Sequence, residues 1–309
     1  MPETNHYLKS YARRNYKKVN GWLGSDTISQ LIQIDGIQRK LGLSGHVGEI
    51  GVHHGKLFIL LYLLAQQGEH AIAVDIFEQQ ALNVDKSGKG SLQVLERNLE
   101  AFTGGKSKLR VINADSTTIG AEQITAATGG YLRLFSIDGG HQSHIVRHDL
   151  NTAASAICEG GVIILDDYFN PEFPGVSECV NQFFLMDNTQ GLVPFFVAMN
   201  KIYLTTQGYA ERYMDHFTRT DIGIPFEATT KFLAYNTSLS PIRITEMFGT
   251  NVISYSPDRF GSVYKAGRTI RKLRSNLRRN LSNSAAWQYL RTIGLARLVR
   301  RLADKIIPY

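Results

Sequence analysis

Short apolar runs alternate with longer amphipathic stretches through the middle of the chain. The runs expected to form strands are 46–50, 71–77, 109–114, 131–137 and 161–165. The stretches expected to form helices lie between them, at 56–67, 91–102, 120–127 and 143–157. Near-continuous apolar strands separated by helices are typical of a parallel sheet that is covered on both faces. The pattern therefore predicts a doubly wound, Rossmann-like α/β fold, in which ligands bind at the carboxyl ends of the strands.

Two further apolar runs, 192–199 and 201–206, follow one another almost directly. Runs so close together are expected to pair as an antiparallel hairpin. The hairpin would lie at one edge of the sheet and bring it to about seven strands. Residues 45–208 are therefore predicted to form the ligand-binding domain.

The segments on either side of this domain have a different character. Residues 1–44 are predicted to form a polar arm with several aromatics, followed by a helix from about Asp26 to about Gly42. Residues 209–264 contain short aromatic segments without a regular period and are expected to cover the substrate side. Residues 265–309 are predicted to form a basic amphipathic helical tail.

The composition excludes several classes of protein. The chain has 309 residues, of which 43% are hydrophobic and 10% aromatic, as in globular proteins. Cys158 and Cys179 are too few for a disulfide framework or a cysteine-based zinc site. The first residues are too polar for a signal peptide, and the most apolar run, 57–65, is too short to span a bilayer. A soluble, cytoplasmic protein is therefore expected.

The excess positive charge lies in the predicted tail. Residues 265–309 hold 12 Lys or Arg and one acid, whereas the rest of the chain holds 22 basic and 26 acidic residues, a net charge of −4. A basic amphipathic helix can lie on an anionic membrane surface, or it can pack its leucines on protein, including a second copy of the chain. The pattern leaves both partners open. The acidic body, without a recognisable nucleic-acid-binding module, argues against nucleic acid.

A turn that contains two glycines follows the first expected strand. Glu49, Gly51 and Gly55 lie where this strand passes into a helix. Gly51 lets the backbone turn sharply and approach a ligand, and Gly55 opens a helix whose first amides carry partial positive charge. The second strand reaches Asp75, which is placed to accept hydrogen bonds from a ribose diol. A purely structural strand–helix turn is the alternative, and Glu49 is open to the same two interpretations.

Two of the expected strands end on acidic residues. Asp138 follows the run 131–137, and Asp166 and Asp167 follow 161–165. Three carboxylates at one edge of a sheet would repel one another and raise one another's pKa values. A hard divalent cation such as Mg²⁺ removes this cost, because it prefers oxygen ligands and keeps open positions for substrate oxygens. We therefore predict a metal site, although an aspartate at a strand end can also be only a cap or turn residue.

Together these features resemble class I S-adenosylmethionine-dependent methyltransferases. The resemblance rests on the glycine turn, on Asp75 and on the segment NADST (113–117), and it spans roughly residues 45–206. It implies that the turn holds the methionine part of the cofactor, that Asp75 holds the ribose, and that Asp115 lies by the adenine amine. The cofactor contacts implied in this way are Glu49, Gly51, Gly55, Asp75, Asp115, Ser116 and Asp138.

The acidic segments narrow the resemblance. They read SIDGGHQSHIVRHDL and GGVIILDDYFNPEFPGV, and they are similar to the metal-dependent branch related to macrolide-sugar (macrocin and mycinamicin) O-methyltransferases. The similarity implies Asp138, Asp166 and Asp167 as metal ligands and His141 as the general base. A neutral imidazole can take the proton of a hydroxyl that the metal has made more acidic. His144 competes for the base role, since it follows His141 at helical spacing.

The function predicted from these residues is an O-methyltransferase that depends on S-adenosylmethionine and a divalent metal. Its expected acceptor is a sugar hydroxyl of a glycan or glycosylated metabolite. The basic tail departs from the macrolide-sugar enzymes and favours a membrane-bound or lipid-linked glycan, with the enzyme peripheral at the inner membrane surface. The alternatives are a hydroxylase-like relative with the same metal triad and a catalytically silent, membrane-associated binding protein.

Overall fold

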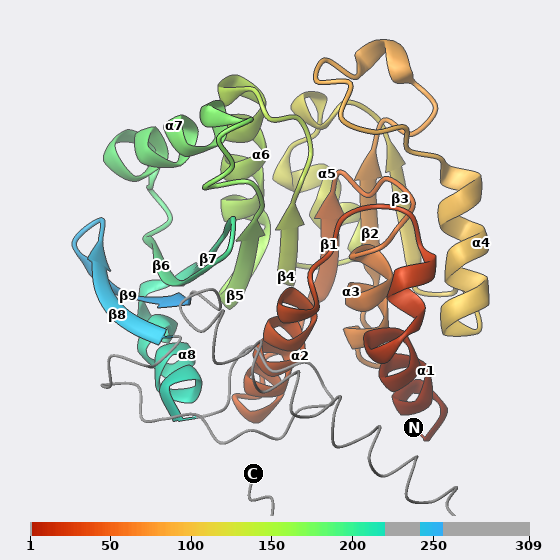
Figure 1. Cartoon of the computed structure of the whole chain (residues 1–309), viewed down its shortest axis with the longest axis horizontal. Coiled ribbons are helices and arrows are strands. Elements are labelled where there is room, and N and C mark those ends of the chain that lie inside the picture. The colour runs from red at the N-terminus through yellow and green to blue at the C-terminus, as the bar shows by residue number, and fades with distance from the viewer. Residues whose placement is uncertain (1, 220–241, 256–309) are drawn as a thin grey trace, which may run out of the picture. The chain divides into compact units, whose positions relative to one another are not determined.

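The computed structural model describes residues 2–219 and 242–255, so the predicted tail lies outside the described residues. A single sheet of nine strands forms its centre, in the order β3-β2-β1-β4-β5-β7-β6-β9-β8 (Figure 1). The parallel strands are β1 (His46–Ile50), β2 (Ala71–Asp75), β3 (Leu109–Asn113), β4 (Leu132–Ile137) and β5 (Ile157–Leu165). The remaining strands are β6 (Leu192–Ala198), β7 (Lys201–Thr206), β8 (Ile242–Met247) and β9 (Thr250–Tyr255).

Helices cover both faces of the sheet. One core contains side chains of α1 (Pro2–Arg13), α2 (Ser25–Lys40), α3 (Phe58–Leu64), α4 (Leu92–Thr103) and α8 (Gln207–Arg219). The other core contains side chains of α5 (Ala121–Thr128), α6 (Ser143–Ala156) and α7 (Pro174–Gln182). Four short helical turns complete the set: η1 (Asn15–Lys18), η2 (Gln80–Leu82), η3 (Ser116–Thr118) and η4 (Phe183–Asp187). Within the described residues, no helix is long and apolar enough to cross a membrane.

The strands are apolar on both sides because both of their faces are buried. In β2, for example, Ala73 belongs to the first core and Val74 to the second. The connections β1–α3–β2, β2–α4–β3 and β4–α6–β5 then join parallel neighbours, as the alternation of strands and helices predicted. The predicted antiparallel hairpin is also present, because β6 pairs with β7 and β7 pairs with β5.

The sheet has nine strands rather than about seven, and the two additional strands lie in the region that was expected to be irregular. β9 pairs with β6, with Phe196 opposite Ile253, and β8 pairs with β9. Most of the β8 side chains are exposed, so an apolar run does not mark this strand in the sequence. Helix α8 does carry a readable signal, because Ala210, Tyr213 and Phe217 recur at helical spacing and are buried.

The N-terminal segment, expected as an arm, is largely helical. Helix α1 contacts α3 and α4, and Tyr11 on this helix is fully buried. The Tyr11 hydroxyl donates a hydrogen bond to the Lys56 carbonyl at 2.7 Å. Its burial raises the pKa of Tyr11, and the nearby Glu49 carboxylate adds to this rise. Tyr11 therefore packs against the domain, whereas Trp22 is 75% exposed and lines the cavity described below.

A buried ion network holds the amino end of β4 to two flanking segments. The Arg133 side chain is fully buried, and its guanidinium lies 2.9 Å from Glu69 Oε2 and 2.9 Å from Asp35 Oδ1. It also donates hydrogen bonds to Gln38 Oε1 at 2.8 Å and to the Leu64 carbonyl at 2.9 Å. The five donors of a guanidinium suit such a set of acceptors. The network therefore ties α2 and the α3–β2 connection to the centre of the sheet.

We expect Arg133→Ala to lower the free energy of unfolding by about 3–5 kcal/mol, because two buried carboxylates would lose their partner. Arg39→Ala is the matched control. Arg39 pairs with the same Asp35 at 2.7 Å, but its side chain is 44% exposed, so its loss should cost about 1 kcal/mol or less. Urea unfolding followed by circular dichroism measures both. Equal losses for the two variants would contradict a central role for the network.

Candidate active site

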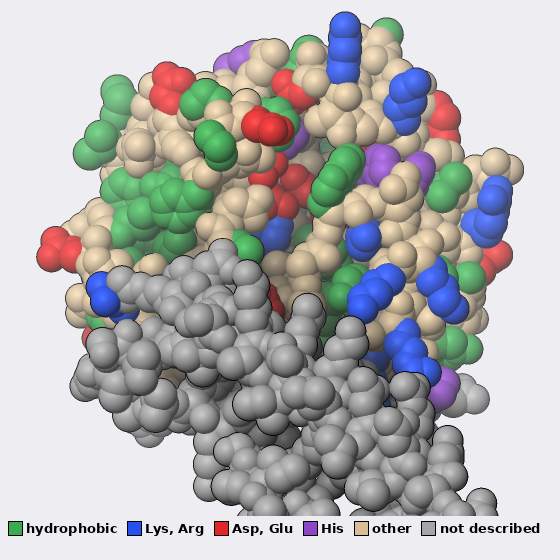
Figure 2. Space-filling model, in the orientation of Figure 1, with side chains coloured by type: hydrophobic (Ala, Val, Ile, Leu, Met, Phe, Trp, Pro, Cys, Tyr) green, Lys and Arg blue, Asp and Glu red, His purple; other side chains and the backbone are tan. Residues whose placement is uncertain are grey.

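A cavity of about 720 Å³ opens at the carboxyl ends of the central strands. Its walls come from the ends of β1, β2, β4 and β5, from η3, and from the connection between β2 and α4. Figure 2 shows acidic side chains gathered in a hollow on this face, with basic and histidine side chains beside them. The site thus lies where a doubly wound sheet places its ligand.

Gly51 allows the ends of β1 and β4 to meet at the cavity. It has a φ of +84°, and a Cβ on it would lie 1.8 Å from the carbonyl oxygen of Asp138. The close approach is fixed by the Asp138 amide, which donates to the Ile50 carbonyl at 2.8 Å. Only glycine tolerates this contact and this conformation together. Gly51 lines the cavity, so its predicted place at the ligand agrees with the structure.

Gly55 lies at the start of the helix that follows the turn, where the Ile59 amide donates to its carbonyl at 2.9 Å. It has a φ of +86°, and a Cβ on it would lie 2.4 Å from Leu95 Cδ1 on helix α4. Gly55 is not among the residues that line the cavity. The second glycine of the turn therefore permits helix packing, and the structure gives it no direct ligand contact.

Glu49 is a buried acid with an unsatisfied oxygen. It lies in β1 with 2% exposure, and its Oε2 has no hydrogen-bond partner among the described residues. Burial raises the pKa of Glu49 well above its usual range, and the charge of Asp138 raises it further. A buried unpaired carboxylate oxygen is costly unless a ligand satisfies it. Glu49 is therefore suited to meet a cationic group.

Asp75 lines the cavity and has a fixed orientation. Its Oδ2 accepts a hydrogen bond from the His53 amide at 2.8 Å, and its Oδ1 accepts one from the Phe77 amide at 2.5 Å. A carboxylate has about four acceptor positions, so these two bonds leave room for ligand hydroxyls. Backbone amides that follow β1 and β2 thus hold Asp75 at the wall of the cavity.

Asp115 and Ser116 line the cavity next to the end of β3. Asp115 Oδ1 accepts hydrogen bonds from the Thr117 amide at 2.9 Å and from the Thr117 hydroxyl at 2.8 Å. Asp115 therefore begins the helical turn η3 as its N-cap. The cap keeps the NADST segment at the wall of the cavity, where the sequence resemblance placed it.

The three predicted metal ligands do not form one group. Ligand atoms of Asp138, His141 and Asp167 all lie within 4.8 Å of one another, which is compatible with one bound cation. Asp166 forms an ion pair with Lys201. Burial and the charge of Asp166 raise the pKa of Asp138 well above its ordinary value. The structure thus joins His141, the predicted base, to two of the predicted ligands.

Lys201 was not identified from the sequence. It is the first residue of β7, where its neighbours are apolar, and it is 7% exposed. Burial alone lowers the pKa of a lysine, but the carboxylates of Asp166 and Asp138 outweigh burial and raise the pKa of Lys201. The side chain therefore carries a permanent positive charge inside the acidic group. A lysine that starts a strand in an otherwise apolar hairpin was the only available signal.

Asp167 is held rigidly by two amides. Its Oδ1 accepts hydrogen bonds from Asn200 Nδ2 at 2.6 Å and Asn170 Nδ2 at 3.0 Å, while its backbone has a φ of +59°. Its Oδ2 lies 3.1 Å from His141 Nε2. Burial would raise the pKa of Asp167, but the bonds from His141, Asn170 and Asn200 lower it overall. One oxygen is thus fixed and the other is directed into the cavity.

His141 lies between two carboxylates and beside an aromatic ring. Its Nδ1 is 3.0 Å from Asp85 Oδ2, and its Nε2 faces Asp167. The ring stacks on Phe173, with centroids 3.8 Å apart. Burial would lower the pKa of His141, but its bonds to Asp167 and Asp85 raise the pKa overall. The imidazole is therefore oriented by contacts on both nitrogens and on one face.

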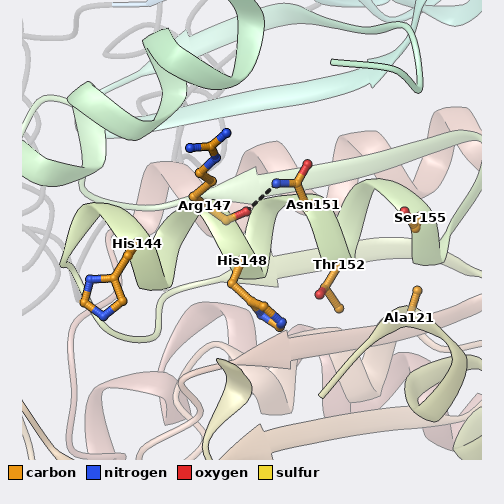
Figure 3. A pocket seen from close by; sticks show the side chains of 7 residues that line it. All are labelled: Ala121, His144, Arg147, His148, Asn151, Thr152 and Ser155. Carbon is orange, nitrogen blue, oxygen red and sulfur yellow. Dashed lines mark hydrogen bonds between the residues drawn. The ribbon is translucent and has the colours of Figure 1, made fainter. Parts of the chain in front are cut away.

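His144, the competing candidate, has a different position. It borders the cavity, but it also lines a second hollow of about 420 Å³ on the outer side of α6. Figure 3 shows His144 and His148 projecting from α6 in this hollow, where Asn151 Nδ2 donates to the Arg147 carbonyl at 2.9 Å. His144 is not part of the group that Asp138 and Asp167 form with His141. The geometry therefore favours His141.

Comparison with known proteins agrees with the fold. Residues 49–168 match a family model described as a methyltransferase domain. Among solved structures, the O-methyltransferase NovP has a TM-score of 0.52 and 16% identity, over 66% of this chain and 97% of that chain. CalS11, a TDP-rhamnose 3'-O-methyltransferase, has a TM-score of 0.44 and 14% identity, over 66% of this chain and 95% of that chain. No curated protein sequence matches the chain.

Residues 49–168 are similar to a methyltransferase domain, and the parallel sheet agrees with the class I fold that the sequence resemblance predicted. The matched segment runs from Glu49 in β1 to Tyr168 after β5, and so contains the glycine turn, Asp75, Asp115 and the acidic strand ends. S-adenosylmethionine is the methyl donor of this class. At 16% identity, the likeness to NovP concerns the fold alone. The molecule that receives the methyl group therefore has to be inferred from the residues of this chain.

Proposed function

We propose that the protein is an O-methyltransferase that uses S-adenosylmethionine and a divalent metal to methylate a sugar hydroxyl of a glycan or glycosylated metabolite. The observation that carries the proposal is the group Asp138, His141 and Asp167, whose ligand atoms lie within 4.8 Å of one another beside the cavity. Two carboxylates and an imidazole offer both cation ligands and a proton acceptor. Transfer to carbon or to an amine would not need this combination.

The cavity is suited to the proposed cofactor. The methionine part of S-adenosylmethionine carries an ammonium group, and Glu49 provides a buried oxygen without a partner among the described residues. Asp75 has acceptor positions left for a ribose diol, and Asp115 and Ser116 line the next part of the wall. The order of these residues along the sheet follows the order of the parts of the cofactor. Donor binding is therefore supported by residues on three successive strands.

The acidic group is suited to a divalent cation. Oxygen ligands of Asp138 and Asp167 match the preference of Mg²⁺ and Mn²⁺, and His141 is left to accept a proton. Lys201 neutralises Asp166, so that the remaining negative charge is concentrated on the two proposed ligands. Burial and the neighbouring carboxylates raise the pKa values of Glu49 and Asp138, and a bound cation would relieve the repulsion between the acids.

Each residue then has a defined role. When bound, the cation favours the ionised form of an acceptor hydroxyl, and S-adenosylmethionine provides the methyl group. His141 accepts the hydroxyl proton, since its Nε2 lies at the mouth of the acidic group and Asp85 occupies its Nδ1. Asp138 and Asp167 hold the cation, and the cavity walls position donor and acceptor in line.

Two measurements test the proposal. Calorimetry should show one molecule of S-adenosylmethionine bound per chain. Methyl label from S-adenosylmethionine should enter a cell-envelope extract, EDTA should abolish the transfer, and Mg²⁺ should restore it, because the two ligand carboxylates repel one another without a cation. Hydrolysis of the product should release a labelled O-methyl sugar. Absence of donor binding would refute a methyltransferase, and full transfer in EDTA would exclude the metal from the mechanism.

The proposed partners extend beyond the described residues. The basic segment 265–309 carries the positive charge that would attract an anionic membrane surface, and it lies outside the described residues. A glycan acceptor at the inner membrane surface would account for such a segment. Membrane association, self-association and a cytoplasmic location stay predictions from the sequence.

A further inference from the structure

The connection between β2 and α4, residues 76–91, is a wall of the cavity that also reaches the proposed base. It includes the turn η2, and eight residues in that turn or after it line the cavity: Gln80, Leu82, Asn83, Val84, Asp85, Ser87, Gly88 and Gly90. Near its end, a Cβ on Gly90 would lie 2.9 Å from Asp75 Oδ1. One connection therefore contacts both the donor side and the acceptor side of the cavity.

Asp85 is the residue through which this connection contacts His141. Asp85 Oδ2 accepts a hydrogen bond from the His141 amide at 2.6 Å and lies 3.0 Å from His141 Nδ1. The two side chains are 11% and 10% exposed, so the contact is sheltered from water. A carboxylate only accepts hydrogen bonds, so Asp85 accepts one from His141 Nδ1. Nε2 lies 3.1 Å from Asp167 Oδ2, so a carboxylate faces each ring nitrogen and the two contacts together fix the orientation of the ring.

The connection is itself well anchored. Asn83 Nδ2 donates to the Gly88 carbonyl at 2.6 Å, which closes the loop around Asp85. A Cβ on Gly88 would lie 3.2 Å from the His53 ring, and the Glu78 carboxylate accepts a hydrogen bond from the Leu92 amide at 3.0 Å. The two hydrogen bonds hold the loop in its middle and at the start of α4. Asp85 therefore approaches His141 from a supported position.

We propose that Asp85 is a positioning residue for the base. It binds both the backbone amide and the Nδ1 atom of His141, and so holds the ring in one orientation, with Nε2 directed toward the acidic group. This proposal rests on the proposed function, because it assigns a partner to the proposed base. It adds that base orientation depends on a loop that also borders the donor pocket.

The test compares Asp85→Asn with the control Lys89→Ala, an exposed residue of the same loop that does not line the cavity. The amide introduced by Asp85→Asn can still accept a bond from the His141 backbone amide, but it carries no charge and therefore holds the ring nitrogen less strongly. We expect kcat to fall about 10- to 100-fold, with the Kd for S-adenosylmethionine changed less than about threefold. Asp85→Glu should recover part of the loss, and Lys89→Ala should match the wild type.

A second readout does not require methyl transfer. In ¹⁵N-labelled protein, the His141 Nδ1 signal should shift in Asp85→Asn, because the hydrogen-bond partner of this nitrogen loses its charge. If no acceptor is methylated but the Nδ1 signal shifts, the positioning contact stands and the proposed function fails. Unchanged ring signals and unchanged kcat in a folded Asp85→Asn variant would refute the positioning role. A fall in kcat that only follows a lower melting temperature, with unchanged ring signals, would refute it as well.

Discussion

Replacing His141 by alanine should lower kcat by about 10²- to 10⁴-fold, while S-adenosylmethionine binds with nearly unchanged affinity. This range is the usual contribution of a positioned general base. His141 is the imidazole in the group with Asp138 and Asp167, and its ring is oriented by Asp85 and by stacking on Phe173. Steady-state kinetics at saturating donor, together with calorimetry of donor binding, would measure both effects.

His144→Ala is the matched control for this prediction, because His144 also borders the cavity and was the competing candidate. It should leave kcat within about threefold of the wild type, since it lies outside the acidic group. A larger loss in His144→Ala than in His141→Ala would transfer the base role to His144. An equal and small loss in both would remove the histidines from proton transfer and leave the hydroxyl to lose its proton to water.

Lys201→Met should destabilise the fold by about 3–5 kcal/mol, because the change leaves buried carboxylates without their cation. Methionine is close to lysine in length and shape, so lost packing contributes little. Lys201 pairs with Asp166, and the charges of Asp138 and Asp167 also act on it. Added Mg²⁺ should raise the melting temperature of Lys201→Met more than that of the wild type, since the excess negative charge favours cation binding.

A double variant separates the charge from the packing. Asp166→Asn combined with Lys201→Met removes both partners of the ion pair and should recover most of the lost stability. If the double variant is as unstable as Lys201→Met, the lysine acts through its packing and not through its charge. Thermal unfolding in EDTA of the wild type, the two single variants and the double variant gives the coupling free energy between Asp166 and Lys201.

The stability defect of Lys201→Met should also depend on pH. The pKa values of Glu49 and Asp138 are already raised in the folded protein, mainly by burial, and removal of the ammonium raises them further. An acid with a raised pKa binds its proton more tightly in the folded state than in the unfolded chain. Its effect on stability is therefore favourable at low pH and is lost as pH rises through the folded-state pKa. The difference in the free energy of unfolding between the wild type and Lys201→Met should accordingly increase from about pH 5 to about pH 8.

The sequence was sufficient to predict the parallel part of the sheet. Strands buried on both faces read as continuous apolar runs, and the helices between them repeat at a different period, so both signals are local. The carboxyl-end acids were found for the same reason, because Asp75, Asp138 and the pair Asp166–Asp167 directly follow apolar runs. The fold class then placed these residues at one edge without further information.

The additional strands and several site contacts could not be read in this way. β9 takes its hydrogen bonds from β6, more than 50 residues earlier, and β8 exposes most of its side chains. Asp85 reaches His141 across 56 residues, and the role of Gly55 depends on Leu95 of a different helix. No local sequence pattern around these residues identifies the residue that each of them contacts.

The sequence by itself determined the order of strands and helices, the class of domain, and which acids face the ligand edge. Only the tertiary structure decided which side chain each acid contacts. His141 forms a group with Asp138 and Asp167, whereas Lys201 forms an ion pair with Asp166. The physical reason is that burial and apolar periodicity act along the chain, whereas charge pairing acts through space. A lysine from an edge hairpin can neutralise a strand-end acid only after the sheet has brought the two together.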